Sequence, residues 1–121
     1  MTAVSTRSFY IEQVRHVTVV CFTVSTMVDP NYEFVSDELF DLVEHLVTNG
    51  PIQVVLDLGS VHKIDDWGLA MLRAFHETIE SHGGTTILCR TQHSIATAIS
   101  IPGLRECFHV RETRSEAIRA F

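Results

Sequence analysis

Two consecutive carboxylates followed by a tryptophan, Asp65, Asp66 and Trp67, form the segment with the clearest capacity for chemistry. They follow the apolar, β-branched run 52–58, which predicts a buried strand, and they precede residues with helical spacing. An aspartate at the start of a helix accepts hydrogen bonds from free backbone N–H groups, and the helix dipole favours its charge. Ligands and partners of α/β proteins bind where strands end and helices begin, so we expect a contact or switch site at residues 65–72.

The role of each of these side chains has two interpretations. Asp66 either supplies a fixed charge of about −1 to a partner, against about −1.5 to −2 for a phosphoserine, or serves only as the N-cap of the helix. Asp65 is expected to satisfy nearby backbone N–H groups. Trp67 is either a binding anchor, as exposed tryptophans often are at interfaces, or a side chain packed against the loop 25–31.

A hydrolase site is a further interpretation of this region, because Ser60, His62 and Asp66 lie close together in the sequence. A serine nucleophile needs a neighbouring base that a third group orients. A serine and a histidine two residues apart are nevertheless common in loops, and the chain contains no nucleophile-elbow motif. We therefore predict a protein that is not an enzyme and has no catalytic residues.

Seven histidines and three cysteines raise the question of a metal site. His76 and Glu80 lie one helical turn apart, but no second ligand pair stands at a fixed spacing. His76 also falls on the predicted buried stripe of its helix, which favours a satisfied core histidine. Cys107 and His109 share one face of a predicted short strand and supply two ligands, fewer than a tetrahedral zinc site needs. We expect neither a metal nor a cofactor.

Composition narrows the class of protein. The 121 residues suit one domain, and 45% hydrophobic residues suffice for a core. The net charge of −6 and the single lysine, Lys63, argue against a nucleic-acid partner. No apolar stretch approaches the roughly 20 residues of a membrane-spanning helix, and residues 1–8 lack the apolar core of a secretory signal. Because Cys21 and Cys89 lie inside apolar runs, we expect reduced thiols and a cytoplasmic protein without membrane insertion.

Strands and helices alternate along most of the chain. The residue patterns predict strands at 9–14, 17–24, 52–58, 85–89 and 107–110, and helices at 32–48, 67–82, 93–101 and 114–121. The turn Arg15-His16 makes the first two strands a hairpin, and Asn49-Gly50-Pro51 ends the first helix. Thr113, with Glu116 three residues later, caps the last helix.

This order predicts the fold class. Strands that alternate with helices become parallel neighbours joined by right-handed crossovers, and the opening hairpin adds one antiparallel strand at the edge. We predict an α/β domain over residues 9–121, after an N-terminal tail at 1–8. It contains a mixed, mostly parallel sheet of four to five strands and about four helices.

The order and the residues together resemble the STAS domain family, which is named from sulfate transporters and anti-sigma-factor antagonists. Typical of that family are an apolar strand ending in Asp-Leu, a short loop, and Asp-x-x-Gly-Leu at the start of a helix. The corresponding residues here are 56–58 and 65–69. Gly83-Gly84 before a strand and Gly103-Leu104 near the end also fit, and the resemblance covers roughly residues 9–121.

The chain departs from the family at the switch position. In the antagonists, a partner kinase phosphorylates the first serine after the aspartate. Here Asp66 stands at that position and Trp67 follows it, so we expect no phosphorylation there. The Gly-x-Leu-Asp turn after the second strand is reduced to Val28-Asp29.

The resemblance implies a protein-binding module of bacterial signalling that regulates transcription. Its partner would be an anti-sigma factor with serine-kinase activity, or other STAS proteins. The implied contact residues are Asp65, Asp66, Trp67, Gly68, Leu69 and Asp29. An accessory STAS subunit of a membrane transport complex and a stress-signalling scaffold subunit stay as alternatives, with the small hydrolase as a third. The residues leave open the oligomeric state and whether Asp66 makes the protein permanently active or inactive.

Overall fold

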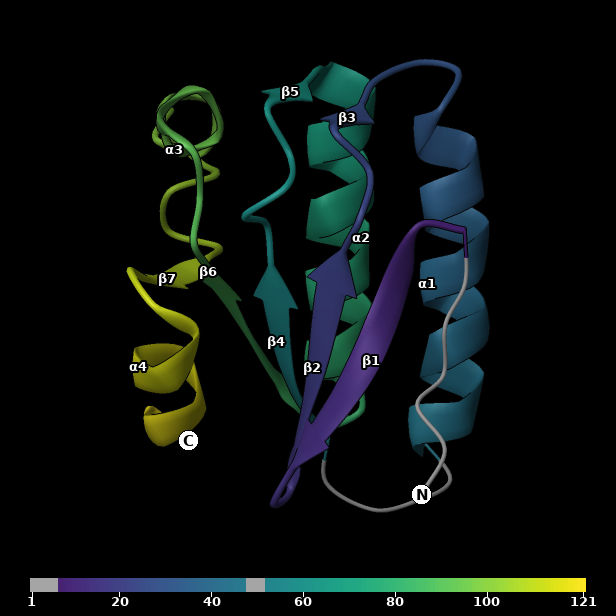
Figure 1. Cartoon of the computed structure of the whole chain (residues 1–121), viewed down its shortest axis with the longest axis vertical. Helices are drawn as coiled ribbons and strands as arrows, with labels where there is room; N and C mark the ends of the chain where they lie inside the picture. Colours follow the sequence, from purple (N-terminus) through teal and green to yellow (C-terminus); the bar gives the residue numbers. More distant parts are fainter. Residues whose placement is uncertain (1–6, 48–51) are drawn as a thin grey trace.

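A five-stranded sheet with the order β1-β2-β4-β6-β7 forms the centre of the computed structural model, which describes residues 7–47 and 52–121 (Figure 1). The strands are β1 (Phe9–Val14), β2 (Val17–Phe22), β4 (Gln53–Asp57), β6 (Thr85–Cys89) and β7 (His109–Arg111). β1 is antiparallel to β2, and every other neighbouring pair is parallel. The predicted mixed sheet with one antiparallel edge strand is confirmed.

Four helices accompany the sheet in the described part of the chain, as predicted. They are α1 (Tyr32–Leu46), α2 (Asp66–Ser81), α3 (His93–Ile99) and α4 (Arg114–Arg119). α1 and α2 cover one face of the sheet and α4 covers part of the other (Figure 1). The predicted helix stop at 49–51 lies outside the described residues. No described helix combines the length and the apolar character that crossing a membrane requires.

The last strand differs from the prediction. It begins at His109 and not at Cys107. Cys107 lies in a turn, where its thiol donates a hydrogen bond to the carbonyl oxygen of Gly103. Cys107 and His109 therefore do not share a strand face. The helix boundaries lie within two residues of the predicted ones, a difference that is usual at fraying helix ends.

The structure also contains a second sheet of two very short strands, which was not predicted. β3 (Thr26–Met27) pairs in parallel with β5 (Lys63–Ile64). Two residues are too few to show an alternating pattern, so the segments look like plain loops in the sequence. The pairing nevertheless holds the two loops together beside the start of α2 (Figure 1).

The two faces of the large sheet carry unequal cores. The face under α1 and α2 holds most of the buried side chains, including Phe9, Leu56 and Phe75. The face under α4 holds a smaller cluster, in which the cysteines of β2 and β6 lie with Val19, Val55 and Ala117. All three cysteines of the chain are free thiols. Burial, and next the charge of Asp57, raises the pKa of Cys89 to about 12, so this thiol is inert at neutral pH.

His76 lies on the buried stripe of α2, as predicted, and is 4% exposed. Its Nε2 is 3.2 Å from Oε1 of Glu80, and its ring packs beside Phe108. Its Nδ1 has no hydrogen-bond partner within the described structure. The prediction of a satisfied core histidine therefore holds for one ring nitrogen and fails for the other.

Candidate functional site

Asp65, and not Asp66, is the N-cap of α2. Its Oδ1 accepts a hydrogen bond from the backbone N–H of Gly68 at 2.9 Å. Its Oδ2 accepts a second one from the backbone N–H of Asp29 at 2.9 Å, across 36 residues of sequence. The interpretation of Asp66 as the cap is therefore wrong, because one carboxylate already serves both the helix and the neighbouring turn. Asp66 is left exposed in the first turn of α2.

These two backbone hydrogen bonds hold the pKa of Asp65 below its ordinary value of 3.8. A carboxylate with a lowered folded-state pKa stabilises the protein fully above its unfolded-state value, and this contribution is lost as pH falls through the folded-state pKa. We expect Asp65→Asn to be less stable than the wild type at neutral pH and to lose less stability below about pH 4. Urea unfolding measured across acidic pH tests this. Asp66→Asn removes the same charge at a position that does not cap the helix. If the stability of Asp66→Asn depends on pH as weakly as that of Asp65→Asn, the assignment of Asp65 as the cap is contradicted.

Gly68 and Leu69, two of the predicted contact residues, face inward. Leu69 is part of the main core, and Gly68 lies against the backbone of β3. A Cβ atom at Gly68 would stand 2.1 Å from the carbonyl oxygen of Met27. These two residues therefore position the start of α2, while Asp66 and Trp67 are exposed on the surface beside them.

Trp67 is the most exposed large hydrophobic residue described, at 58%. Its ring stacks on Tyr32 at the start of α1, with 5.8 Å between the ring centroids and 17° between the planes. The loop 25–31, which was the expected packing partner, ends one residue before this tyrosine. Stacking on one face holds the indole in place and leaves much of its surface exposed to solvent.

The surroundings of this aromatic pair are negatively charged. Asp29, Glu33 and Asp66 are exposed, and none of them forms an ion pair within residues 7–47 and 52–121. Partial burial and the nearby carboxylates, first Glu33 and then Asp29, raise the pKa of Tyr32. We call the surface formed by Asp29, Glu33, Asp66 and Trp67 the acidic tip.

The alternative hydrolase group is not assembled. Ser60, His62 and Asp66 are exposed, and no hydrogen bond joins their side chains in the described structure. The main chain of His62 instead binds Ser25 and Ser94. A nucleophile, base and orienting acid need direct contacts, so this arrangement provides no activated serine. Over the same residues, no three His, Cys, Asp or Glu side chains are grouped to hold a metal ion.

The sequence did not predict a buried ion cluster on the face of the sheet that α4 covers. Asp57 was noted there only as part of a strand motif. The Asp57 carboxylate is 3% exposed. Its Oδ2 accepts hydrogen bonds from Arg114 Nη2 at 2.9 Å and Arg90 Nη1 at 3.2 Å, and its Oδ1 from the Gly59 N–H at 2.9 Å. Arg114 also bonds Glu12 at 2.9 Å. An aspartate inside an apolar strand was the available signal, but its cationic partners come from distant segments. The cluster ties α4 to the sheet.

Comparisons with known proteins agree with this architecture. A family model described as STAS domain matches residues 10–117. No curated protein sequence matches the chain. An anti-sigma-factor antagonist (STAS) domain protein from Planctomyces limnophilus has a similar structure, with a TM-score of 0.79 and 18% identity over 91% of this chain and 94% of that one.

Two further solved structures are similar. The phosphorylated form of the Bacillus cell fate determinant SpoIIAA has a TM-score of 0.65 and 16% identity, over 93% of this chain and 98% of that one. The murine anion transporter Slc26a9 has a TM-score of 0.74 and 18% identity, with 90% of this chain matched to 18% of the transporter. At these identities the likeness establishes the fold.

Proposed function

The chain belongs to the STAS domain family, and on that premise we propose that it is a non-enzymatic, protein-binding module similar to an anti-sigma-factor antagonist. Its contact surface is the acidic tip at the start of α2. The partner is an anti-sigma factor with serine-kinase activity, or another STAS protein. The position that a kinase modifies in the antagonists carries the permanent charge of Asp66.

The proposal rests on one observation: the two adjacent aspartates at the start of α2 have different roles. Asp65 makes both structural hydrogen bonds at the start of α2, and Asp66 makes none. The fold therefore does not need the carboxylate of Asp66 as a cap. An exposed charge beside a 58% exposed tryptophan has the composition of an interface anchor with a polar neighbour.

We expect Trp67→Ala to weaken binding of the anti-sigma factor by at least about 30-fold, which is the 2 kcal/mol of a central interface aromatic. The partner is first captured from native cytosol and identified by mass spectrometry, and its affinity is then measured by calorimetry with purified proteins. Ile101→Ala is the matched control, because Ile101 is 49% exposed and is not one of the residues of the tip. Equal losses in both variants, or none in Trp67→Ala, would remove the tip as the contact surface.

Asp66→Ser tests the meaning of the fixed charge. With the kinase partner and ATP, this variant is expected to accept phosphate at position 66, whereas the wild type accepts none there. If the unphosphorylated variant binds the partner and the wild type does not, then Asp66 imitates the phosphorylated, non-binding state. If both bind equally, the wild type is a permanently active antagonist.

The similarity to Slc26a9 supports a second candidate, an accessory subunit of a membrane transport complex that uses the same surface. Capture of a transport protein, with the same dependence on Trp67, would favour this role over the anti-sigma role. Turnover of a generic ester that is lost in Ser60→Ala would overturn the non-enzymatic proposal itself.

A further inference from the structure

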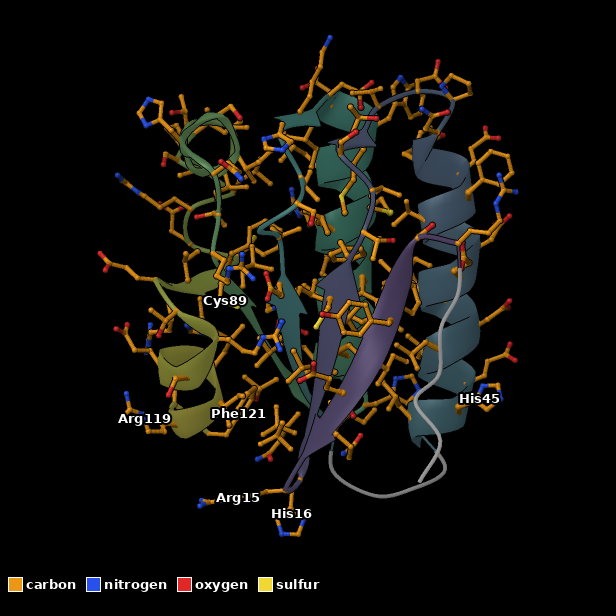
Figure 2. All side chains as sticks on the ribbon, viewed as in Figure 1. Arg15, His16, His45, Cys89, Arg119 and Phe121 are labelled. Carbon is orange, nitrogen blue, oxygen red and sulfur yellow. The ribbon has the colours of Figure 1, made fainter. Side chains whose placement is uncertain are left out.

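A groove of about 800 Å³ lies between the hairpin turn of β1 and β2 and the helix α4. Figure 2 shows Arg15, His16, Arg119 and Phe121 gathered around this end of the molecule. We call this groove the basic groove, and its lining includes Val14, Arg15, Val17, Ile118, Arg119 and Phe121. Its size is in the range of sites that hold several side chains and not a single ion.

The groove exists because α4 is short. Its six residues cover only part of a sheet face, while the opposite face carries two longer helices. Val14, Ile118 and Phe121 pack against the small core from the edge and stay partly exposed. The floor of the groove is therefore apolar and open to solvent.

The rim of the groove is positively charged in a protein whose net charge is −6. Arg114 lines the groove but is already bound to Asp57 and Glu12. Arg15 and Arg119 form no ion pair within the described structure, and no described Asp or Glu side chain lines the groove. Two of the nine basic residues thus present free charge to whatever occupies this site.

The acidic tip is the complement of this groove on the same molecule. The tip combines an exposed indole with unpaired carboxylates, and the groove combines an apolar floor with unpaired guanidinium groups. The two surfaces lie at opposite ends of the long axis, where Figure 1 shows the starts of α1 and α2 at one end and α4 with the hairpin turn at the other. One copy therefore cannot satisfy both surfaces by folding back on itself.

We propose that the acidic tip of one copy occupies the basic groove of a second copy, so that the protein self-associates head to tail. Trp67 covers the apolar floor, and Asp66 with its neighbouring carboxylates faces Arg15 and Arg119. Such an interface is heterologous, so it leaves a free groove at one end of each dimer and a free tip at the other, and longer chains can form. If the proposed function is also right, self-association masks Trp67 and competes with partner binding.

Light scattering and sedimentation test this with the purified protein alone. The wild type is expected to exceed its monomer mass of 13.6 kDa increasingly with concentration, and to return toward it as salt screens the charges. Asp66→Asn/Trp67→Ala removes the indole and one carboxylate of the tip and keeps the groove. Arg15→Glu/Arg119→Glu reverses the charge of the groove and keeps the tip. Each variant alone is expected to be a monomer.

A mixture of the two variants is expected to form a heterodimer of one copy of each, because it contains one intact tip and one intact groove. Trp67 is the single tryptophan of the chain, so the fluorescence of the mixture reports only the copy with the intact tip. Its emission is expected to shift to shorter wavelength on mixing. Heterodimer formation also shows that both variants are folded.

Arg105→Glu/Arg111→Glu makes the same charge change at exposed positions outside the groove and is expected to self-associate like the wild type. The proposal is overturned if the wild type stays monomeric at all concentrations or if the mixture forms no heterodimer. It is also overturned if the control variant loses self-association as completely as the groove variant does. Binding of a monomeric wild type to phosphatidylglycerol vesicles through Arg15 and Arg119 overturns it as well, because lipid would then be the occupant. No other protein is present, so failure here is distinct from failure of the proposed function.

Discussion

Replacing Asp57 with alanine is expected to lower the free energy of unfolding by about 3–5 kcal/mol, the usual cost of removing one partner from a buried ion pair. The carboxylate is 3% exposed and accepts hydrogen bonds from Arg114, Arg90 and the backbone of Gly59. Without it, the Arg114 guanidinium, 27% exposed, loses its most buried acceptor. Urea unfolding measures the loss, and α4 is expected to be the first element released.

The reactivity of the cysteine thiols can be used to measure the release of α4. Cys21 and Cys89 stand in register on either side of Asp57, on the face that α4 covers. A thiol reagent is expected to modify both cysteines faster in Asp57→Ala than in the wild type, while Cys107 provides the common baseline. Arg90→Ala is the matched control, since this side chain is 54% exposed and its pairing is worth about 1 kcal/mol or less. An Asp57→Ala variant no less stable than Arg90→Ala would show that the cluster does not hold α4.

Replacing Gly68 with alanine is expected to cost about 3 kcal/mol, the upper part of the range for overpacking. Inside a helix, alanine is normally about 1 kcal/mol more stable than glycine, so the expected sign is reversed. The reason is the carbonyl oxygen of Met27, 2.1 Å from the position that the new Cβ would take. No change of side-chain rotamer relieves a clash with backbone, so α2 and β3 must separate.

Urea unfolding of Gly68→Ala, compared with Ala74→Gly on the exposed face of the same helix, measures this effect. Ala74→Gly is expected to lose about 1 kcal/mol from helix propensity alone. Because α2 carries Trp67 and β3 leads into the turn at Asp29, Gly68→Ala is also expected to disturb the stacking of Trp67 on Tyr32, which tryptophan fluorescence detects. A neutral or stabilised variant would show that this close approach is not required.

The features of this protein that can be predicted from its sequence are those that depend on short-range interactions. Local patterns were enough for the hairpin at Arg15-His16, for the positions of the main strands, and for Thr113 as the cap of α4, where its side chain accepts a hydrogen bond from the N–H of Glu116. Each of these depends on residues within a few positions of one another. Hydrophobic periodicity and capping chemistry act over that range, so these features can be predicted from one chain.

The choice between Asp65 and Asp66 as the cap was beyond local information, since either aspartate suits an N-cap. It was decided by the backbone N–H of Asp29, which β3 and β5 bring beside the start of α2.

The sequence by itself thus determined the order of elements and the motif that resembles the STAS family, because these follow from short-range pattern, and it indicated residues 65–69 as the candidate site. Only the tertiary structure decided that Trp67 stacks on Tyr32, that Asp57 is paired with Arg114, and that an acidic tip and a basic groove lie at opposite ends. These features join residues from separate elements, and folding alone brings such residues together.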